Sequence, residues 1–214
     1  LILIGKLREG AYSVFSVTFL RWWTGKKMMG ISRVYLWFAS ETFVLNTFYR
    51  LMGAVIGEGG SLDDVFLDEP ELVSVGEDSF LDFQTTILPG EVIGDTLVLR
   101  RIEVGMHVRT EPKVVFLGGS NIARGSYILA ASVCSHQGTD SSQEYKTLEG
   151  NPAKTLCATS ITYKHMPSVS GTALYSLLQL IGFYPLVLCN VACFAASLSI
   201  AVAIERSAGL FAAV

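Results

Sequence analysis

An aliphatic residue returns at every sixth position through the middle of this 214-residue chain. With one slip of a residue after Leu99 and one exception at Thr110, the series is Val75, Leu81, Ile87, Ile93, Leu99, Val104, Thr110, Phe116, Ile122, Ile128 and Cys134. An amphipathic helix returns an apolar residue every third or fourth position, and a half-buried strand every second. A period of six excludes both, and it is typical of a chain wound into coils of short strands and tight turns.

Each hexad is predicted to form one short strand with its aliphatic side chain inside the coil, followed by a turn where Gly or Asp accepts an unusual backbone conformation. Stacked coils cover one another's inward residues, which one coil cannot bury alone. On this reading Ile93 points inward, and Ile93→Asp is expected to unfold the coil because it buries an unpaired charge. Residues 65–74, which contain the acidic run 68–71, break the spacing and are expected to form an irregular turn or bulge.

The repeat resembles that of the hexapeptide-repeat acyltransferases. The resemblance implies an all-β core, a single-stranded left-handed parallel β-helix with three hexads in each coil, over residues 53–160. The left hand comes from the resemblance alone, since parallel crossovers are otherwise almost always right-handed. The expected fold adds interfacial helices on the amino-terminal side, in residues 1–52, and a transmembrane helix segment on the carboxyl-terminal side, in residues 161–214.

Composition supports membrane contact. The chain is 50% hydrophobic and 16% charged, with a mean hydropathy of +0.45, which is unusual for a soluble protein. Residues 166–204 hold no charged side chain and exceed the ~20 residues that cross a bilayer. Pro185 lies inside this stretch, so one kinked helix and a tight pair of helices are both open.

The first fifty residues are basic and aromatic. Arg21, Trp22 and Trp23 are typical of an interfacial anchor. Residues 34–52 are predicted to form a helix that lies on the membrane or packs against another helix, and a buried core helix is the alternative. The basic charge favours the cytoplasmic face of an anionic membrane, with the β-helix on that side.

Residues 57–99 contain no Lys or Arg, which argues against nucleic acid as a partner of the repeat. The cysteines, Cys134, Cys157, Cys189 and Cys193, have neither zinc spacing nor a disulfide pattern, which indicates a reducing compartment. The three histidines, His107, His136 and His165, do not converge in sequence as a zinc site would require, so no metal is expected. The chain begins with Leu1 and ends in an apolar segment, and it is expected to be part of a longer polypeptide.

The segment from Cys134 to Asp140 resembles the histidine segment of hexapeptide acetyltransferases, with Gln137 where a Pro often stands. The resemblance implies that His136 is a general base, a role that suits imidazole because it titrates close to physiological pH. Asp140 or Glu144 is expected to fix its tautomer. The alternative is a solvent-facing loop histidine. His107 is expected to point outward from the middle of its hexad.

Residues 150–154, Gly-Asn-Pro-Ala-Lys, resemble the closing motif of the same family. The resemblance implies that Lys154 lies near the phosphates of coenzyme A and that Asn151 adds a polar contact. The alternative is a plain turn with a solvated lysine. No tightly bound cofactor is expected; the donor is coenzyme A or a carrier-bound phosphopantetheine thioester.

The order of features is similar to one unit of the membrane-embedded C-terminal region of ε-poly-lysine synthetase-type nonribosomal peptide synthetases. The matching segments are residues 20–23, 46–57 and 66–76, followed by the apolar tail. The resemblance implies a membrane-attached transferase that moves an acyl or aminoacyl group to an amine or hydroxyl acceptor. Its partners would be membrane lipid, other β-helical modules or two further copies in a homotrimer.

This chain lacks an adenylation domain and a carrier serine motif, and it contains one β-helical module. Two alternatives therefore stand beside the membrane transferase. One is a non-catalytic scaffold whose acidic residues 58–95 dock partner modules. The other is a freestanding, trimeric O-acetyltransferase that uses coenzyme A.

Overall fold

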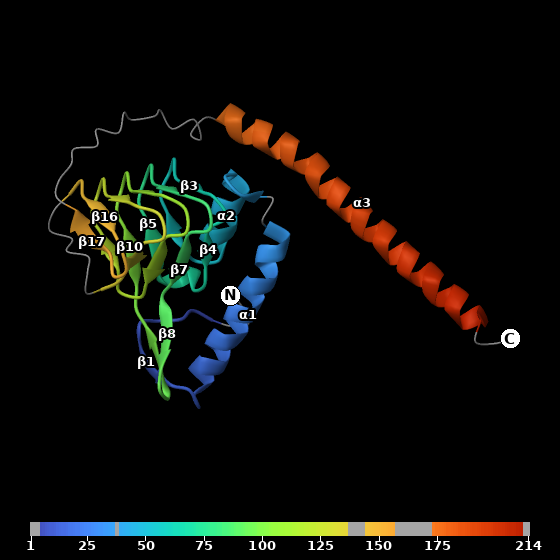
Figure 1. Cartoon of the computed structure of the whole chain (residues 1–214), viewed down its shortest axis with the longest axis horizontal. Coiled ribbons are helices and arrows are strands. Elements are labelled where there is room, and N and C mark those ends of the chain that lie inside the picture. Colours follow the sequence, from blue (N-terminus) through green and yellow to red (C-terminus); the bar gives the residue numbers. More distant parts are fainter. Residues whose placement is uncertain (1–4, 37–38, 137–143, 157–172, 212–214) are drawn as a thin grey trace.

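Short strands in three parallel sheets form the body of the protein in the computed structural model, which describes residues 5–36, 39–136, 144–156 and 173–211 (Figure 1). The first sheet contains β2 (Val55–Ile56), β5 (Val73–Val75), β10 (Ile102–Val104) and β13 (Asn121–Ile122). The second contains β3 (Ser61–Leu62), β6 (Phe80–Leu81), β11 (Arg109–Thr110), β14 (Tyr127–Ile128), β16 (Thr147–Glu149) and β17 (Lys154–Leu156). The third contains β4 (Phe66–Leu67), β7 (Thr86–Leu88), β12 (Val115–Leu117) and β15 (Val133–Cys134).

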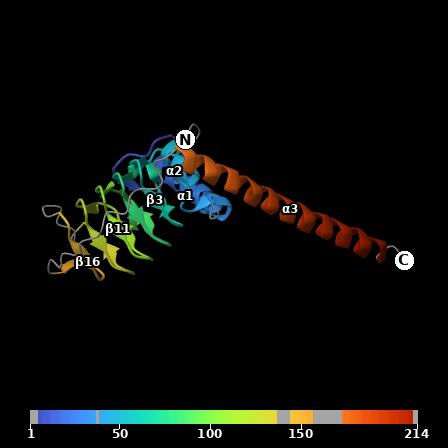
Figure 2. The ribbon, with the colours of Figure 1, turned by 90° about the horizontal axis from the view of Figure 1, so that it is seen from above.

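The chain visits the three sheets in turn, and each coil stacks on the one before it (Figure 2). Every pairing within these sheets is parallel except that of β16 with β17. The prediction of parallel coils built from hexads is therefore confirmed.

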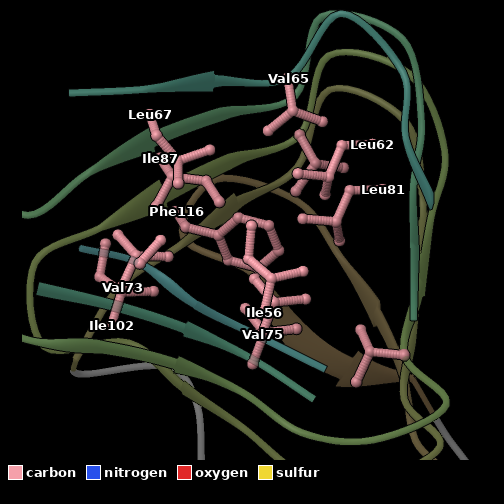
Figure 3. Packing of buried hydrophobic residues seen from close by; sticks show 14 of the residues in the cluster. Ile56, Leu62, Val65, Leu67, Val73, Val75, Leu81, Ile87, Ile102 and Phe116 are labelled. Carbon is pink, nitrogen blue, oxygen red and sulfur yellow. The ribbon is translucent and has the colours of Figure 1, made fainter. Parts of the chain in front are cut away.

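The hexad aliphatics fill the coil interior. In the third sheet Leu67 pairs with Ile87, Ile87 with Phe116 and Phe116 with Cys134, so the four side chains form one ladder. Figure 3 shows Phe116 at the centre, with residues from the walls of all three sheets directed toward it. Burial of one such side chain stabilises the fold by about 1.5–3 kcal/mol.

The exception in the series, Thr110, is buried and its hydroxyl is satisfied. Its Oγ1 accepts the Asp82 N–H at 2.9 Å and lies 3.2 Å from Thr85 Oγ1, in a hydrogen bond in which either oxygen can be the donor. A threonine is therefore compatible with an inward position, because the coil supplies hydrogen-bond partners for it.

A hairpin interrupts the coils. It is formed by β8 (Gly90–Ile93) and β9 (Thr96–Leu99), and β1 (Gly10–Ser13) pairs antiparallel with β9. The prediction that Ile93 points inward is wrong, because Ile93 lies on β8 with 54% of its surface exposed. Leu99 is buried, but it packs in a second cluster with Leu7, Trp22, Leu72 and Leu97. The hexad spacing continues through the hairpin by coincidence, and the slip after Leu99 marks its end.

The expected irregularity in residues 65–74 is confirmed, because a 3-10 helix (Pro70–Leu72) follows β4.

The helix α1 (Val17–Leu36) lies beside this segment and packs along the first coil through pairs such as Arg33 with Asp64 at 3.2 Å. Trp22 is 6% exposed and packs inside the second cluster, so its expected role as an interfacial anchor is wrong. Trp23 is half exposed, with the Lys27 ammonium 5.8 Å from its ring centroid.

The helix α2 (Phe43–Leu51) covers the open end of the first coil. Leu45 and Tyr49 are buried in the main core. The Tyr49 hydroxyl donates to the Val65 carbonyl at 2.7 Å, and the Asn46 amide donates to the Gly60 carbonyl at 2.7 Å. For this part of residues 34–52, one face of α2 is buried in the core, as the alternative of a core helix predicts, and α2 also contacts α3 (Ala173–Phe211), as the reading of a helix packed against another helix predicts.

One long helix, α3 (Ala173–Phe211), leads away from the coils and contains Pro185 (Figure 2). This resolves the choice between one helix and a tight pair. Gln179 joins α3 to α2: its Oε1 accepts the Phe43 N–H at 3.2 Å and its Nε2 donates to the Glu41 carbonyl at 3.1 Å. Within the described residues one segment, Ile181–Val202, is long and apolar enough to cross a membrane, and none of its most apolar window is buried.

Candidate active site

The coils turn a corner after each strand of the third sheet, and these corners stack along one edge of the β-helix. Parallel register holds them above one another, since Leu67 pairs with Ile87, Leu88 with Leu117 and Phe116 with Cys134. We call this edge the corner column; from the first coil to the fourth it contains Asp68–Glu69, Pro89–Gly90, Gly118–Gly119 and Ser135–His136. Neighbouring strands lie about 4.8 Å apart, so three steps separate Glu69 from His136 by about 14 Å.

His136 lies at the fourth corner with its side chain exposed. It packs over the backbone of Gly119 in the coil before it. A Cβ atom added to Gly119 would lie 3.3 Å from His136 Cβ and 3.5 Å from Cδ2. Gly119 has a φ of +86°, which favours glycine, so both the turn and the close approach of the imidazole depend on the absence of a side chain there.

An arginine side chain packs on the same glycine as this histidine. The same added Cβ on Gly119 would lie 3.3 Å from Arg100 Cδ, so the stems of Arg100 and His136 flank one glycine. Arg100 comes from the root of the hairpin, where its N–H donates to the Pro89 carbonyl at 3.0 Å. Its neighbour Arg101 pairs with Glu9 at 3.1 Å, whereas no acidic partner of Arg100 lies within the described ranges. An exposed histidine and an exposed arginine thus pack on the same glycine, a pairing of side chains that suits proton transfer near a developing negative charge.

The Gly150–Lys154 segment forms the turn between β16 and β17. It packs on β15: the Val133 N–H donates to the Gly150 carbonyl at 2.9 Å, and the Ala153 N–H donates to the Val133 carbonyl at 2.8 Å. The Asn151–Pro152 bond is cis. Asn151 and Lys154 are exposed, and Lys154 lies opposite Glu149 in the antiparallel register. The turn thus binds Val133, three residues before His136, and it lies on the last coil.

Of the other candidate residues named from the sequence, some lie outside the described residues and the rest have a defined place in the structure. Asp140, proposed to orient His136, lies outside the described residues, as do Cys157 and His165. His107 lies in a turn with a φ of +56°, partly exposed, and its Nδ1 is 3.9 Å from Asp78 Oδ2. Within the described ranges no group of three or more His, Cys, Asp or Glu is placed to hold a metal ion. Burial raises the pKa of the Cys134 thiol to about 12, which makes it a poor nucleophile.

Sequence reasoning missed two buried carboxylates at the first corner. Asp68 and Glu69, counted above only as part of an acidic run, are 3% and 2% exposed. Lys26 Nζ lies 2.6 Å from Asp68 Oδ2, and the Trp22 indole N–H donates to Glu69 Oε1. Burial, followed by the charge of Asp68, raises the pKa of Glu69 from 4.5 to about 7. The only signal in the sequence was that the hexad spacing fails at these residues.

Comparison with known proteins gives one curated relative. No protein-family model matches the chain. Over 104 residues, or 49% of its length, the chain is 28% identical to a delta-poly-L-ornithine synthetase of Acinetobacter baumannii, and it spans 8% of that protein.

Similar solved structures are a hexapeptide-repeat-containing acetyltransferase of Vibrio cholerae, a maltose O-acetyltransferase of Clostridium difficile and a galactoside acetyltransferase in complex with coenzyme A. Their sequence identities to this chain are 13%, 14% and 15%, and their TM-scores are 0.47, 0.48 and 0.44. The alignments cover 64%, 69% and 70% of this chain, and 92%, 91% and 86% of those chains.

Proposed function

We propose that this chain is a membrane-attached transferase module that moves an acyl or aminoacyl group from a thioester to an amine or hydroxyl acceptor. The observation that carries the proposal is the fourth corner of the column, where an exposed His136 lies over the Gly119 backbone and Arg100 packs on the same glycine. The proposal includes a left-handed coil and a β-helical unit over residues 53–160.

The proposed reaction needs one group that accepts and returns a proton. The acceptor nitrogen or oxygen attacks the thioester carbonyl carbon while His136 takes its proton. The tetrahedral intermediate then collapses, the C–S bond breaks, and the imidazolium returns the proton to the departing thiolate sulfur. The Arg100 guanidinium would stabilise the oxyanion of the intermediate or the phosphates of the donor. Asp140 keeps its proposed role of fixing the histidine tautomer.

Coenzyme A or a carrier-bound phosphopantetheine is the proposed donor. Lys154 supports a donor with phosphate groups, because its side chain is exposed on the last coil, one coil beyond His136. Asn151 would add a polar contact from the same turn. The donor would bind from this end of the β-helix and leave the first coil free.

An amine acceptor and an aminoacyl donor are favoured by the curated relative, which is named for the synthesis of poly-L-ornithine and is 28% identical over its matched segment. Since the chain spans 8% of that relative, we propose that the module acts within a nonribosomal-peptide-synthetase-like protein. Its partners would be similar β-helical modules or two further copies of itself.

Membrane attachment is proposed through α3, whose Ile181–Val202 segment is apolar and unburied. Along α1 an exposed apolar surface supports contact with the same membrane; it contains Val17, Leu20, Trp23, Met28, Ile31 and Val34. Lys27 lies beside Trp23 on this helix, which suits an anionic headgroup layer, and the β-helix would lie on the cytoplasmic side.

The test is turnover by the full chain in lipid nanodiscs. Acetyl-coenzyme A and an aminoacyl pantetheine thioester would each be offered with an amine acceptor. His136→Ala is expected to lower turnover at least a hundredfold, within the range for loss of a general base, while His107→Ala, a partly exposed histidine in another turn, leaves it unchanged. The preferred donor decides between acetyl and aminoacyl transfer. A folded protein with no turnover on either donor would overturn the transferase and favour a docking scaffold.

A further inference from the structure

A small cavity lies between α1 and the first corner of the column. Its volume is about 150 Å³, which is the size of cavities that hold a benzene-sized molecule. Most of its wall is apolar, with Leu7, Met29 and Met52 among the lining residues, and the polar part includes Asp68 and Glu69. A cavity with this lining would suit a short apolar group that ends in a positive charge.

The two carboxylates have oxygen atoms that nothing in the described ranges satisfies. Asp68 Oδ1 and Glu69 Oε2 are buried and have no hydrogen-bond partner there. Glu69 uses its other oxygen to accept the Trp22 indole N–H. Buried carboxylate oxygens are almost always paired, because a buried unpaired charge costs several kcal/mol. Two unpaired oxygens on adjacent residues that line one cavity therefore indicate a missing cationic partner.

Lys26 shows which kind of partner the site accepts. Its ammonium lies 2.6 Å from Asp68 Oδ2 and 5.2 Å from the centroid of the Trp22 ring. An ammonium at this place therefore gains both a carboxylate and an aromatic face. Lys26 pairs with one oxygen of four, and among the described residues that line the cavity it is the only lysine or arginine.

The site has an opening to solvent. Lys26 and Asp68 also line a wider groove of about 510 Å³ between α1 and Phe66 on the outer surface. The Lys26 side chain is 40% exposed, whereas that of Asp68 is fully buried. Lys26 thus stands between the groove and the cavity, and a rotation of its flexible stem toward solvent would expose the carboxylates.

We propose that this cavity binds the primary ammonium group of an alkylamine ligand, held by Asp68 and Glu69 with its apolar stem against Leu7, Met29 and Met52. Lys26 occupies the ammonium position in the empty site and is displaced into the groove when the ligand binds. The inference goes beyond the proposed transferase, since it does not depend on His136 or on any thioester donor.

The test is isothermal titration calorimetry of the full chain in lipid nanodiscs with n-pentylamine, and with n-pentanol as the uncharged probe of similar size. The amine is expected to bind saturably and the alcohol at least tenfold more weakly. Asp68→Asn and Glu69→Gln should each weaken the amine at least tenfold, while Glu58→Gln, which removes an exposed carboxylate from the same coil, leaves binding unchanged. Lys26→Ala should strengthen amine binding at least tenfold, because the internal competitor is gone.

Several results would overturn the proposal: no saturable binding of the amine, equal binding of amine and alcohol, or equal binding to the wild type and to both carboxylate variants. Circular dichroism establishes that each variant is folded. If the carboxylate variants fail to fold, the ratio of amine affinity to alcohol affinity and the amine affinity of Lys26→Ala still test the proposal. A Lys26→Ala protein that is folded and binds the amine no more tightly than the wild type means that the Lys26–Asp68 pair serves the fold alone.

Discussion

The Trp22 indole donates a hydrogen bond to the carboxylate of Glu69, 47 residues further along the chain, and both side chains are buried. This bond joins α1 to the first corner of the column. Gly90, at the start of the hairpin, packs against both side chains: an added Cβ would lie 2.8 Å from Glu69 Oε1 and 2.8 Å from Trp22 Nε1. One carboxylate thus lies where three segments that are far apart in the sequence meet.

Trp22→Phe is expected to destabilise the protein by about 2–3 kcal/mol, because it removes a hydrogen bond to a buried carboxylate. The matched control is Trp23→Phe on the same helix, which should change stability by less than about 0.5 kcal/mol because Trp23 is half exposed. Thermal unfolding followed by circular dichroism compares them. Equal melting temperatures for the two variants would contradict the role given to Trp22.

Stability should fall as pH rises from about 4.5 to about 7 because of Glu69. Its pKa is about 7 in the folded protein and 4.5 in its ordinary state, so over this range the folded state binds the proton more tightly than the unfolded state. The stabilisation is full below pH 4.5 and is lost as pH passes 7, a change of about 3 kcal/mol. Glu69→Gln should remove this part of the pH dependence, which denaturant unfolding at several pH values would measure. If the free energy of unfolding of Glu69→Gln changes with pH in parallel with that of the wild type, the role given to Glu69 is refuted.

Replacing either of two isoleucines in the same hexad series by aspartate should give very different losses of stability. Ile87→Asp places a charge in the sealed coil, where Ile87 is fully buried, and is expected to unfold the β-helix. Ile93→Asp lies on the exposed face of the hairpin and should cost less than about 0.5 kcal/mol. The β signal and melting temperature measure both. Unfolding by Ile93→Asp would mean that the hairpin is part of the coil interior.

Gly119→Ala should lower turnover at least tenfold, because the added methyl meets both His136 and Arg100 at 3.3 Å. Gly94→Ala is the control: its φ is +57° and its added Cβ meets nothing within 4 Å. Both changes place a side chain on a left-handed backbone, at about 1–2 kcal/mol each. If both variants lose the same amount of stability and only Gly119→Ala loses turnover, the loss of turnover comes from the steric contact and not from backbone strain. Equal turnover in the two variants would count against a role for the fourth corner.

The hexad spacing predicts the coils because each hexad supplies one strand with one inward side chain, and three such strands complete one coil. It fails at Ile93 because a hairpin of two four-residue strands and a short turn happens to preserve the spacing while leaving the coil. Only the side chains around the insertion reveal it, since Leu97 and Leu99 pack against Trp22 instead of the main core.

The prediction of His136 rests on a local motif, and the structure adds what no local motif contains. Arg100, at the root of the hairpin and 36 positions earlier, packs on the same Gly119 as this histidine. The buried pair at the first corner was hidden for a different reason. Asp68 and Glu69 belong to an acidic run that is typical of a solvated surface, and their burial depends on α1 folding back over them.

The two hydrogen bonds of Gln179 have a mechanical consequence. A pull on α3 passes through Gln179 to the amino end of α2, and from Tyr49 and Asn46 of α2 into the first coil. These two hydrogen bonds therefore transmit such a pull to the first coil, whereas His136 lies at the fourth corner, about 14 Å away.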